Sequence, residues 1–121
     1  MQTRELQKVA WQPYHDVFYE RERHSISGNI KIAQNVYSPQ LGTRRDILIY
    51  SPPSYEGSQG RYPVLYMHDG YNLFDEATSY TGEWHVDETM EQMAQQENLE
   101  AIVVGIPSMG KDRLAEYSPF V

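Results

Sequence analysis

The sequence predicts an α/β fold in which a β-hairpin precedes a strand–helix–strand unit, all in one mixed sheet. Three observations lead to this prediction. Apolar and polar residues alternate over residues 26–36, as they do in a half-buried strand. Residues 62–67 and 101–106 are apolar almost throughout, which is typical of strands covered on both faces. Between them, residues 83–96 repeat apolar side chains at helical spacing.

The hairpin is expected from strands at residues 26–36 and 45–50. Residues 38–42 (Ser-Pro-Gln-Leu-Gly) have turn chemistry, and Pro52 and Pro53 end the second strand because proline cannot donate to a ladder. A connection this short favours antiparallel pairing. We therefore expect the hairpin to form one edge of the sheet.

The strand–helix–strand unit is expected from residues 62–67, 83–96 and 101–106, with a loop at 71–82. The helical stripe consists of Val86, Met90, Met93 and Ala94. The acids Asp87 and Glu88 fall in the early turns, where they suit the positive end of the helix dipole. Two strands joined through a helix run parallel, and the last strand is expected to be central.

The chain divides into an N-terminal arm at residues 1–25 and one domain at 26–121. Its 121 residues suffice for one domain. Pro13 argues against a helix in the arm. After residue 106 we expect no further helix to cover the second sheet face. That open face should be covered by oligomerisation or by association with another part of a longer protein.

Composition excludes several classes of function. The net charge of −7 argues against nucleic-acid binding, which needs a surplus of cations on one face. The chain has no cysteine, so disulfides and thiolate–metal sites are excluded. Its longest apolar run, residues 101–104, is too short to cross a membrane. The first ten residues do not resemble a signal peptide, and a cytoplasmic location is expected.

No metal or other cofactor is expected. The histidines lack the spacing of a zinc site. Asp69, Asn72, Asp75 and Glu76 could supply oxygens to calcium, but they lack the spacing of a calcium loop. Asp69 and Asp75 are instead expected to brace their loop by accepting backbone N–H bonds.

The most informative run is at residues 62–75, where an apolar strand leads into His68, Asp69 and Gly70. After such a turn, backbone N–H groups can point outward and stabilise an oxyanion. An ordinary strand-to-loop turn would use the same residues.

A resemblance to a known family extends this reading. Residues 68–74 (His-Asp-Gly-Tyr-Asn-Leu-Phe) resemble a segment of the esterase family that contains esterase D and the enterochelin esterases. Residues 103–106, followed by 112–114 and 116–119, are similar to that family's next strand and the loop after it. The resemblance covers residues 26–121 in the family's order.

The resemblance implies the N-terminal portion of an α/β-hydrolase fold and Ser-His-acid hydrolysis of a small-molecule ester. In that fold a backbone N–H between the third strand and the first helix helps to form the oxyanion hole. By position this donor is the N–H of Tyr71, and Gly70 would allow substrate to approach closely. Asp69, Asn72 and Arg113 are the candidate substrate contacts.

The chain departs from the family at the nucleophile. The Gly-x-Ser-x-Gly elbow is absent, and the nearest match, residues 105–110, follows the wrong strand. Ser108 is therefore expected to be a turn residue. With no counterpart of the family's Ser, acid or His, the enzyme assignment stays open. The alternative is a non-catalytic binding or assembly module; a carbohydrate-binding β-sandwich is a third hypothesis.

Several side chains have both a structural and a functional interpretation. His68 is expected to shape the turn after its strand, and His85 to cap or flank the helix; His15 and His24 fall in the arm. Arg113 and Glu116, at i and i+3, favour a local ion pair, against a role for Arg113 at a pocket rim. Two aromatic residues fit either packing or an acyl pocket: Tyr80 and Trp84.

Overall fold

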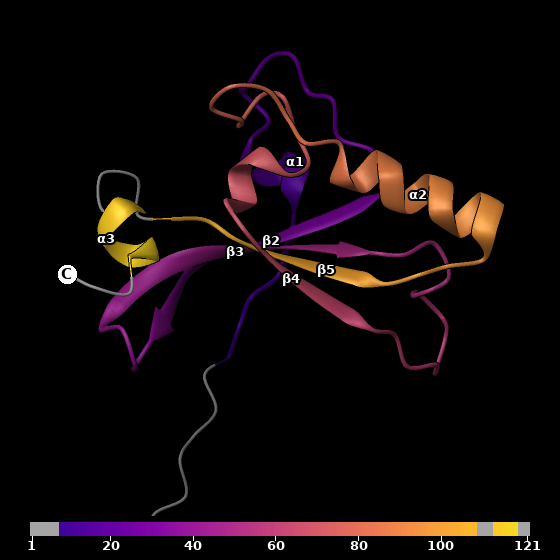
Figure 1. Ribbon diagram of the computed structural model, residues 1–121, viewed down its shortest axis with the longest axis horizontal. Helices are drawn as coiled ribbons and strands as arrows, with labels where there is room; N and C mark the ends of the chain where they lie inside the picture. Colours follow the sequence, from indigo (N-terminus) through magenta and orange to yellow (C-terminus); the bar gives the residue numbers. More distant parts are fainter. Residues whose placement is uncertain (1–7, 109–112, 119–121) are drawn as a thin grey trace, which may run out of the picture.

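The computed structural model describes residues 8–108 and 113–118 (Figure 1). All its strands belong to one mixed sheet in the order β1-β2-β3-β5-β4. The strands are β1 (Gln12–Pro13), β2 (Asn29–Ser38), β3 (Thr43–Ser51), β4 (Val64–His68) and β5 (Ile102–Ile106). The helices are α1 (Tyr14–Val17), the 3₁₀ turn η1 (Gly70–Asn72), α2 (Val86–Glu97) and α3 (Arg113–Tyr117). A single sheet excludes the β-sandwich hypothesis for the described residues.

The predicted hairpin is confirmed, although β2 lies two to three residues further along the chain than expected and β3 is longer than expected. β2 and β3 pair antiparallel, with Ile30 opposite Tyr50 and Ile32 opposite Leu48. The Gly42 N–H donates to the Ser38 carbonyl at 2.8 Å and closes the turn. The arm adds β1 outside β2, so the hairpin itself does not form the edge of the sheet.

The strand–helix–strand unit is also confirmed. β4 and β5 run parallel, α2 connects them, and β5 is central because it also pairs antiparallel with β3. The helix begins at Val86, three residues later than predicted. His85, which precedes it, has a left-handed backbone with φ 56°, so residues 83–85 belong to the loop.

The prediction that residues 62–67 are covered on both faces is wrong for the described residues. β4 lies at the edge of the sheet, and Val64, Leu65 and Tyr66 are 43%, 50% and 69% exposed. An apolar sequence shows that a strand is suited to burial, but it does not show which other element packs against that strand. Among the described residues, β4 pairs with β5 alone.

Two short helices were not expected. α1 follows Pro13 directly, because proline suits the start of a helix, where its missing N–H has no partner to lose. α3 follows β5 as a single short helix, and the expectation that no helix covers the second sheet face stays a prediction. Among the described residues, no helix is long and apolar enough to cross a membrane.

The core lies between the sheet and the segments on one side of it. Figure 1 shows α1, η1 and α2 on the same side of the strands. Tyr14 of the arm is buried in this core with Leu48 and Tyr50 of β3, and Leu73 and Phe74 after η1 fill its centre. On β3, Ile47 and Ile49 alternate with these buried residues and are only half-buried.

Candidate functional site

The candidate site lies where the two parallel strands end. His68 and Ile106 are register partners at the carboxyl ends of β4 and β5, so the segments that follow them start side by side. Ligands of α/β proteins bind in the crevice outside these ends. A cavity of about 810 Å³ occurs there. It is lined by Asp69, Tyr71, Asn72, Thr78, Ser79, Tyr80, Thr81, Trp84, Pro107, Ser108 and Arg113.

Asp69 and Arg113 form a bidentate ion pair on this cavity. Arg113 Nε donates to Asp69 Oδ1 at 2.9 Å, and Arg113 Nη2 donates to Asp69 Oδ2 at 2.7 Å. Asp69 is 9% exposed and has a left-handed backbone with φ 56°. Two parallel charge-assisted bonds fix both position and orientation. The pair therefore holds the start of η1 against α3.

Gly70 is required for close backbone packing. A Cβ at this position would lie 2.9 Å from both the Gly105 carbonyl carbon and Pro107 Cδ. A Cβ added at Gly105 would in turn lie 3.2 Å from the Gly70 Cα. Gly70 is buried and is not a lining residue of the cavity. The close approach that the structure shows is to β5, and the expected approach of substrate to Gly70 stays a prediction.

Two backbone N–H groups of η1, those of Gly70 and Tyr71, precede the first residue whose N–H forms a hydrogen bond within the turn. That bond runs from the Asn72 N–H to the Asp69 carbonyl at 2.8 Å, and Gly70 and Tyr71 precede it. The Tyr71 side chain is held from two sides: its hydroxyl donates to Asp46, and its ring meets Phe18 edge-on at 5.9 Å. Burial and the contact with Asp46 raise the pKa of Tyr71.

Asn72 shapes the loop that forms the other wall of the cavity. Its Oδ1 accepts from the Tyr80 N–H at 2.9 Å, and its carbonyl accepts from the Trp84 N–H at 2.8 Å. Tyr80 is 91% exposed and Trp84 is 51% exposed. Exposure this large does not fit the packing interpretation of these two aromatics, which instead form an apolar rim.

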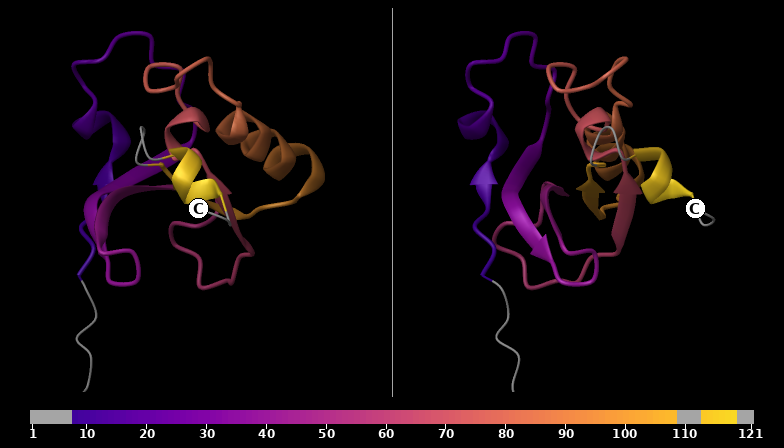
Figure 2. Two further views of the ribbon diagram at one scale, coloured as in Figure 1. Left: turned by 60° about the vertical axis from the view of Figure 1, so that its left-hand side comes forward. Right: turned by 90° about the vertical axis from the view of Figure 1, so that its left-hand side faces the viewer.

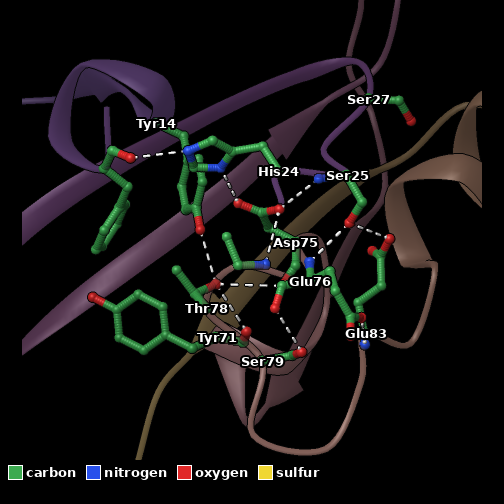
Figure 3. Close-up of polar contacts among 12 residues, drawn as sticks. Tyr14, His24, Ser25, Ser27, Tyr71, Asp75, Glu76, Thr78, Ser79 and Glu83 are labelled. Carbon is green, nitrogen blue, oxygen red and sulfur yellow. Dashed lines mark hydrogen bonds and ion pairs between the residues drawn. The ribbon is translucent and has the colours of Figure 1, made fainter. Parts of the chain in front are cut away.

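The N-terminal arm forms hydrogen bonds with the loop that forms this wall of the cavity (Figure 3). Asp75 is buried and accepts from the Ser25 N–H at 2.7 Å and the Ala77 N–H at 3.3 Å, and His24 Nδ1 lies 2.7 Å from it. Burial alone would raise the pKa of Asp75, but these hydrogen bonds outweigh it and lower the pKa. The expected bracing role of Asp75 is confirmed.

A second set of hydrogen bonds connects the arm to the cavity wall. The Tyr14 hydroxyl donates to Thr78 Oγ1 at 2.8 Å, and Thr78 Oγ1 donates to the Tyr71 carbonyl at 3.1 Å. Figure 2 shows the arm and this loop side by side above the same end of the sheet. Tyr71 is thus held by both the arm and the hairpin.

The structure gives Arg113 and Glu116 long-range partners. Arg113 pairs with Asp69, as above, and Glu116 accepts from Arg45 of β3. A smaller cavity of about 240 Å³ lies beside Arg45 and shares Tyr71, Pro107 and Ser108 with the first. Arg113 lies on the cavity rim, with its side chain 49% exposed.

The remaining sequence candidates are only partly placed at the cavity. Ser108 lines it, but Gly110, the last residue of the approximate nucleophile motif, lies outside the described residues. His68 is exposed at the end of β4. His24 contacts Asp75, and His85 precedes α2 as its N-cap residue without a side-chain capping bond.

Sequence reasoning missed part of the cavity wall and the residues behind it. Thr78, Ser79, Thr81 and Pro107 line the cavity, and Asp46 holds Tyr71 from 25 positions away. Isolated polar residues in a loop give no local signal. Only the pairing of β3 with β5 brings Asp46 near η1.

The cavity lies beyond the carboxyl ends of adjacent parallel strands, with the left-handed residue Asp69 on its wall, which is the place where α/β proteins bind their ligands. The chain matches the family described as "Putative esterase" over residues 38–120, well over half of its length, and belongs to that family.

One similar protein is "Uncharacterized protein YbbA" of Bacillus subtilis (strain 168), which is 35% identical over 82 residues. The match covers 67% of this chain and 28% of that relative, so this chain spans less than a third of the relative it matches. No solved structure matches the chain.

Proposed function

We propose that this chain is the N-terminal portion of a carboxylic-ester hydrolase and supplies its oxyanion loop at residues 69–72. The observation that carries the proposal is the place of this loop. It has the sequence that resembles the family's segment, and it lines the cavity at the carboxyl ends of β4 and β5. Within the family, the esterase D and enterochelin-esterase branch is the subtype that the resemblance favours.

The backbone of η1 supports an oxyanion role. The N–H groups of Gly70 and Tyr71 precede the first bond of the turn, and Tyr71 lies on the cavity. A donor held in place before the reaction stabilises the negative charge that develops on the ester oxygen in the transition state. Tyr71 is held in place by contacts with Asp46, Phe18 and Thr78. These contacts would keep its N–H group oriented before the substrate binds.

The substrate would lie between a polar and an apolar wall. Arg113 and Asn72 provide donors for a polar group of the ester, and Tyr80 and Trp84 provide apolar surface for its acyl or alcohol part. Asp69 would act through Arg113 by fixing its guanidinium. We place the Ser nucleophile, its His and its acid outside these 121 residues.

Titration with an uncharged short-chain ester tests the binding part of this proposal. Phenyl acetate added to ¹⁵N-labelled protein should shift the amide signals of Tyr71, Asn72 and Tyr80. Trp84→Ala should weaken these shifts, whereas Trp11→Ala, which changes an exposed tryptophan of the arm, should leave them unchanged. Shifts confined to other segments would contradict the site.

Hydrolysis tests where the nucleophile lies. The 121-residue protein should not hydrolyse p-nitrophenyl acetate at an enzyme-like rate, because a bound ester would have no activated serine. Enzyme-like turnover that Ser108→Ala abolishes would show that Ser108 is the nucleophile and that this part of the proposal is wrong.

A second candidate function is a non-catalytic assembly module, and the edge of the sheet favours it. Val64, Leu65 and Tyr66 of β4 are exposed on an edge strand, and such an edge can pair with a further strand. Light scattering should detect self-association that Leu65→Lys reduces. A well-folded monomer at high concentration would count against this function.

A further inference from the structure

Four side chains able to bind a cation gather where the loop after η1 enters α2. They are Glu83, His85, Asp87 and Glu88. One ligand atom each from Glu83, His85 and Glu88 lie within 4.8 Å of one another. His85 Nδ1 lies 3.3 Å from Glu83 Oε1 and 3.7 Å from Glu88 Oε2. This cluster is separate from the cavity at the ends of β4 and β5.

Glu83 and Asp87 are buried, Glu88 is half-buried, and each of the three carboxylates has an oxygen without a hydrogen-bond partner among the described residues. Glu83 has a side chain only 1% exposed, and its Oε1 accepts from Ser25 Oγ at 2.7 Å. Asp87 is fully buried, and its Oδ2 accepts from the Ser27 N–H at 2.7 Å. The remaining oxygens have no hydrogen-bond partner among the described residues: Glu83 Oε2, Asp87 Oδ1 and Glu88 Oε2.

A proton, a water molecule or a cation can satisfy such oxygens. Buried acceptors without a donor are costly, and adjacent carboxylates repel one another. Within this cluster His85 is the one group that can carry positive charge.

We propose that Glu83, His85 and Glu88 bind a divalent cation of the zinc class. The donor set is one imidazole nitrogen and two carboxylates, which suits a borderline ion such as Zn²⁺. Ligands at about 2.0–2.2 Å from a tetrahedral ion lie about 3.3–3.6 Å from each other. The separations of 3.3 and 3.7 Å between ligating groups are close to that spacing. Calcium is disfavoured because it takes six to eight oxygens.

The surroundings fit a bound ion. The His85 side chain is 69% exposed and that of Glu88 is 36% exposed, so solvent reaches the site from one side. Ser25 and Ser27 hold Glu83 and Asp87 from the other side. Such neighbouring hydrogen bonds orient ligating groups before the ion arrives.

The ion would connect three segments of the chain. Glu83 is tied to Ser25 of the arm, Glu88 belongs to α2, and Trp84 lies between two of the ligands in sequence and lines the large cavity. Metal binding would therefore stabilise the fold and fix Trp84 in place. This inference does not depend on ester hydrolysis at the cavity.

Calorimetric titration of the 121-residue protein with Zn²⁺ tests the proposal. One ion should bind per chain, and Zn²⁺ should raise the melting temperature by mass action. His85→Ala and Glu88→Gln should each weaken Zn²⁺ binding about tenfold or more and remove most of the thermal shift. Both change partly exposed side chains, so these variants should fold. Two controls should bind Zn²⁺ as the wild type does: His15→Ala and Glu97→Gln, both exposed.

Three results would overturn the proposal. The first is the absence of saturable Zn²⁺ binding, in which case the cluster holds a shared proton. The second is Zn²⁺ binding that His85→Ala and Glu88→Gln leave unchanged. The third is Ca²⁺ binding as tight as that of Zn²⁺, because it would remove the imidazole nitrogen from the ligand set.

Discussion

Backbone atoms of β5 tightly constrain any replacement of Gly70. Its missing Cβ allows the turn after β4 to contact the backbone of β5 at Gly105. Backbone atoms on both sides cannot move aside as a flexible side chain can. This contact aligns the two strand ends from which the cavity residues extend.

Gly70→Ala should therefore destabilise the protein by about 2–3 kcal/mol, the range of overpacking in a tight interior. The matched control is Gly60→Ala, where the nearest atom is the exposed side-chain hydroxyl of Ser58, and it should cost well under 1 kcal/mol. Urea unfolding measures both. Equal effects of the two substitutions would show that the Gly70–Gly105 contact is not tight.

The Tyr14 hydroxyl connects the arm to the cavity loop through Thr78. Tyr14→Phe should lower the free energy of unfolding by about 1 kcal/mol, because Thr78 loses one donor while the buried ring remains. Tyr19→Phe, at a residue 73% exposed, serves as the control and should have no effect. A Tyr14→Phe variant as stable as the wild type would mean that water replaces the lost bond.

At the scale of elements, the sequence predicted which segments form strands and helices better than it predicted which segments contact one another. Alternation over 26–36 and the stripe from Val86 to Ala94 follow from local periodicity, and both elements are present. The start of α2 was misplaced because the left-handed backbone of His85 has no sequence signature. Asp87 was assigned to a helix-dipole role, yet it is buried against Ser27, 60 positions away.

The candidate site was predictable to a similar extent. The loop at 69–72 was located from its resemblance, and its cavity position follows from strand order. The partner of Arg113 was not predictable, because the i, i+3 spacing favoured Glu116 whereas tertiary structure brings Asp69 to it. Long-range contacts such as that between Asp46 and Tyr71 carry no local pattern at all.

The contact between the arm and the loop predicts a specific pH dependence. The folded-state pKa of Asp75 is lowered from 3.8, so Asp75 contributes stability that is fully present above the unfolded pKa. As the pH falls below about 3.8, the unfolded chain takes up this proton first. The contribution then declines and is lost once the pH passes the folded-state pKa.

Asp75→Asn removes this contribution. The variant should be less stable than the wild type at pH 7, and the difference between them should shrink as the pH is lowered below 4. Asp16→Asn, in the exposed part of α1, is the control. Thermal unfolding from pH 7 to 3 measures the effect. A difference that stays constant with pH would show that the Asp75 charge is not involved.

At the scale of the whole molecule, the two edges of the sheet differ. β1 is a two-residue strand that covers the β2 side, whereas β4 presents five residues at the other edge. β5 pairs with strands on both sides, while β4 pairs with β5 alone. The contacts of the arm with the loop at residues 71–82 stabilise the side of the molecule that carries α1 and α2.

This asymmetry predicts that β4 opens before the rest of the sheet. Amides on an edge strand with exposed side chains exchange through local opening, and those of central strands exchange only through larger unfolding. Hydrogen exchange should therefore be faster at Leu65 and Tyr66 than at Val103 and Leu48. If association at the β4 edge occurs, raising the protein concentration should slow exchange in β4 and leave β2 unchanged. Exchange in β4 as slow as in β5 at low concentration would mean that the edge is already covered.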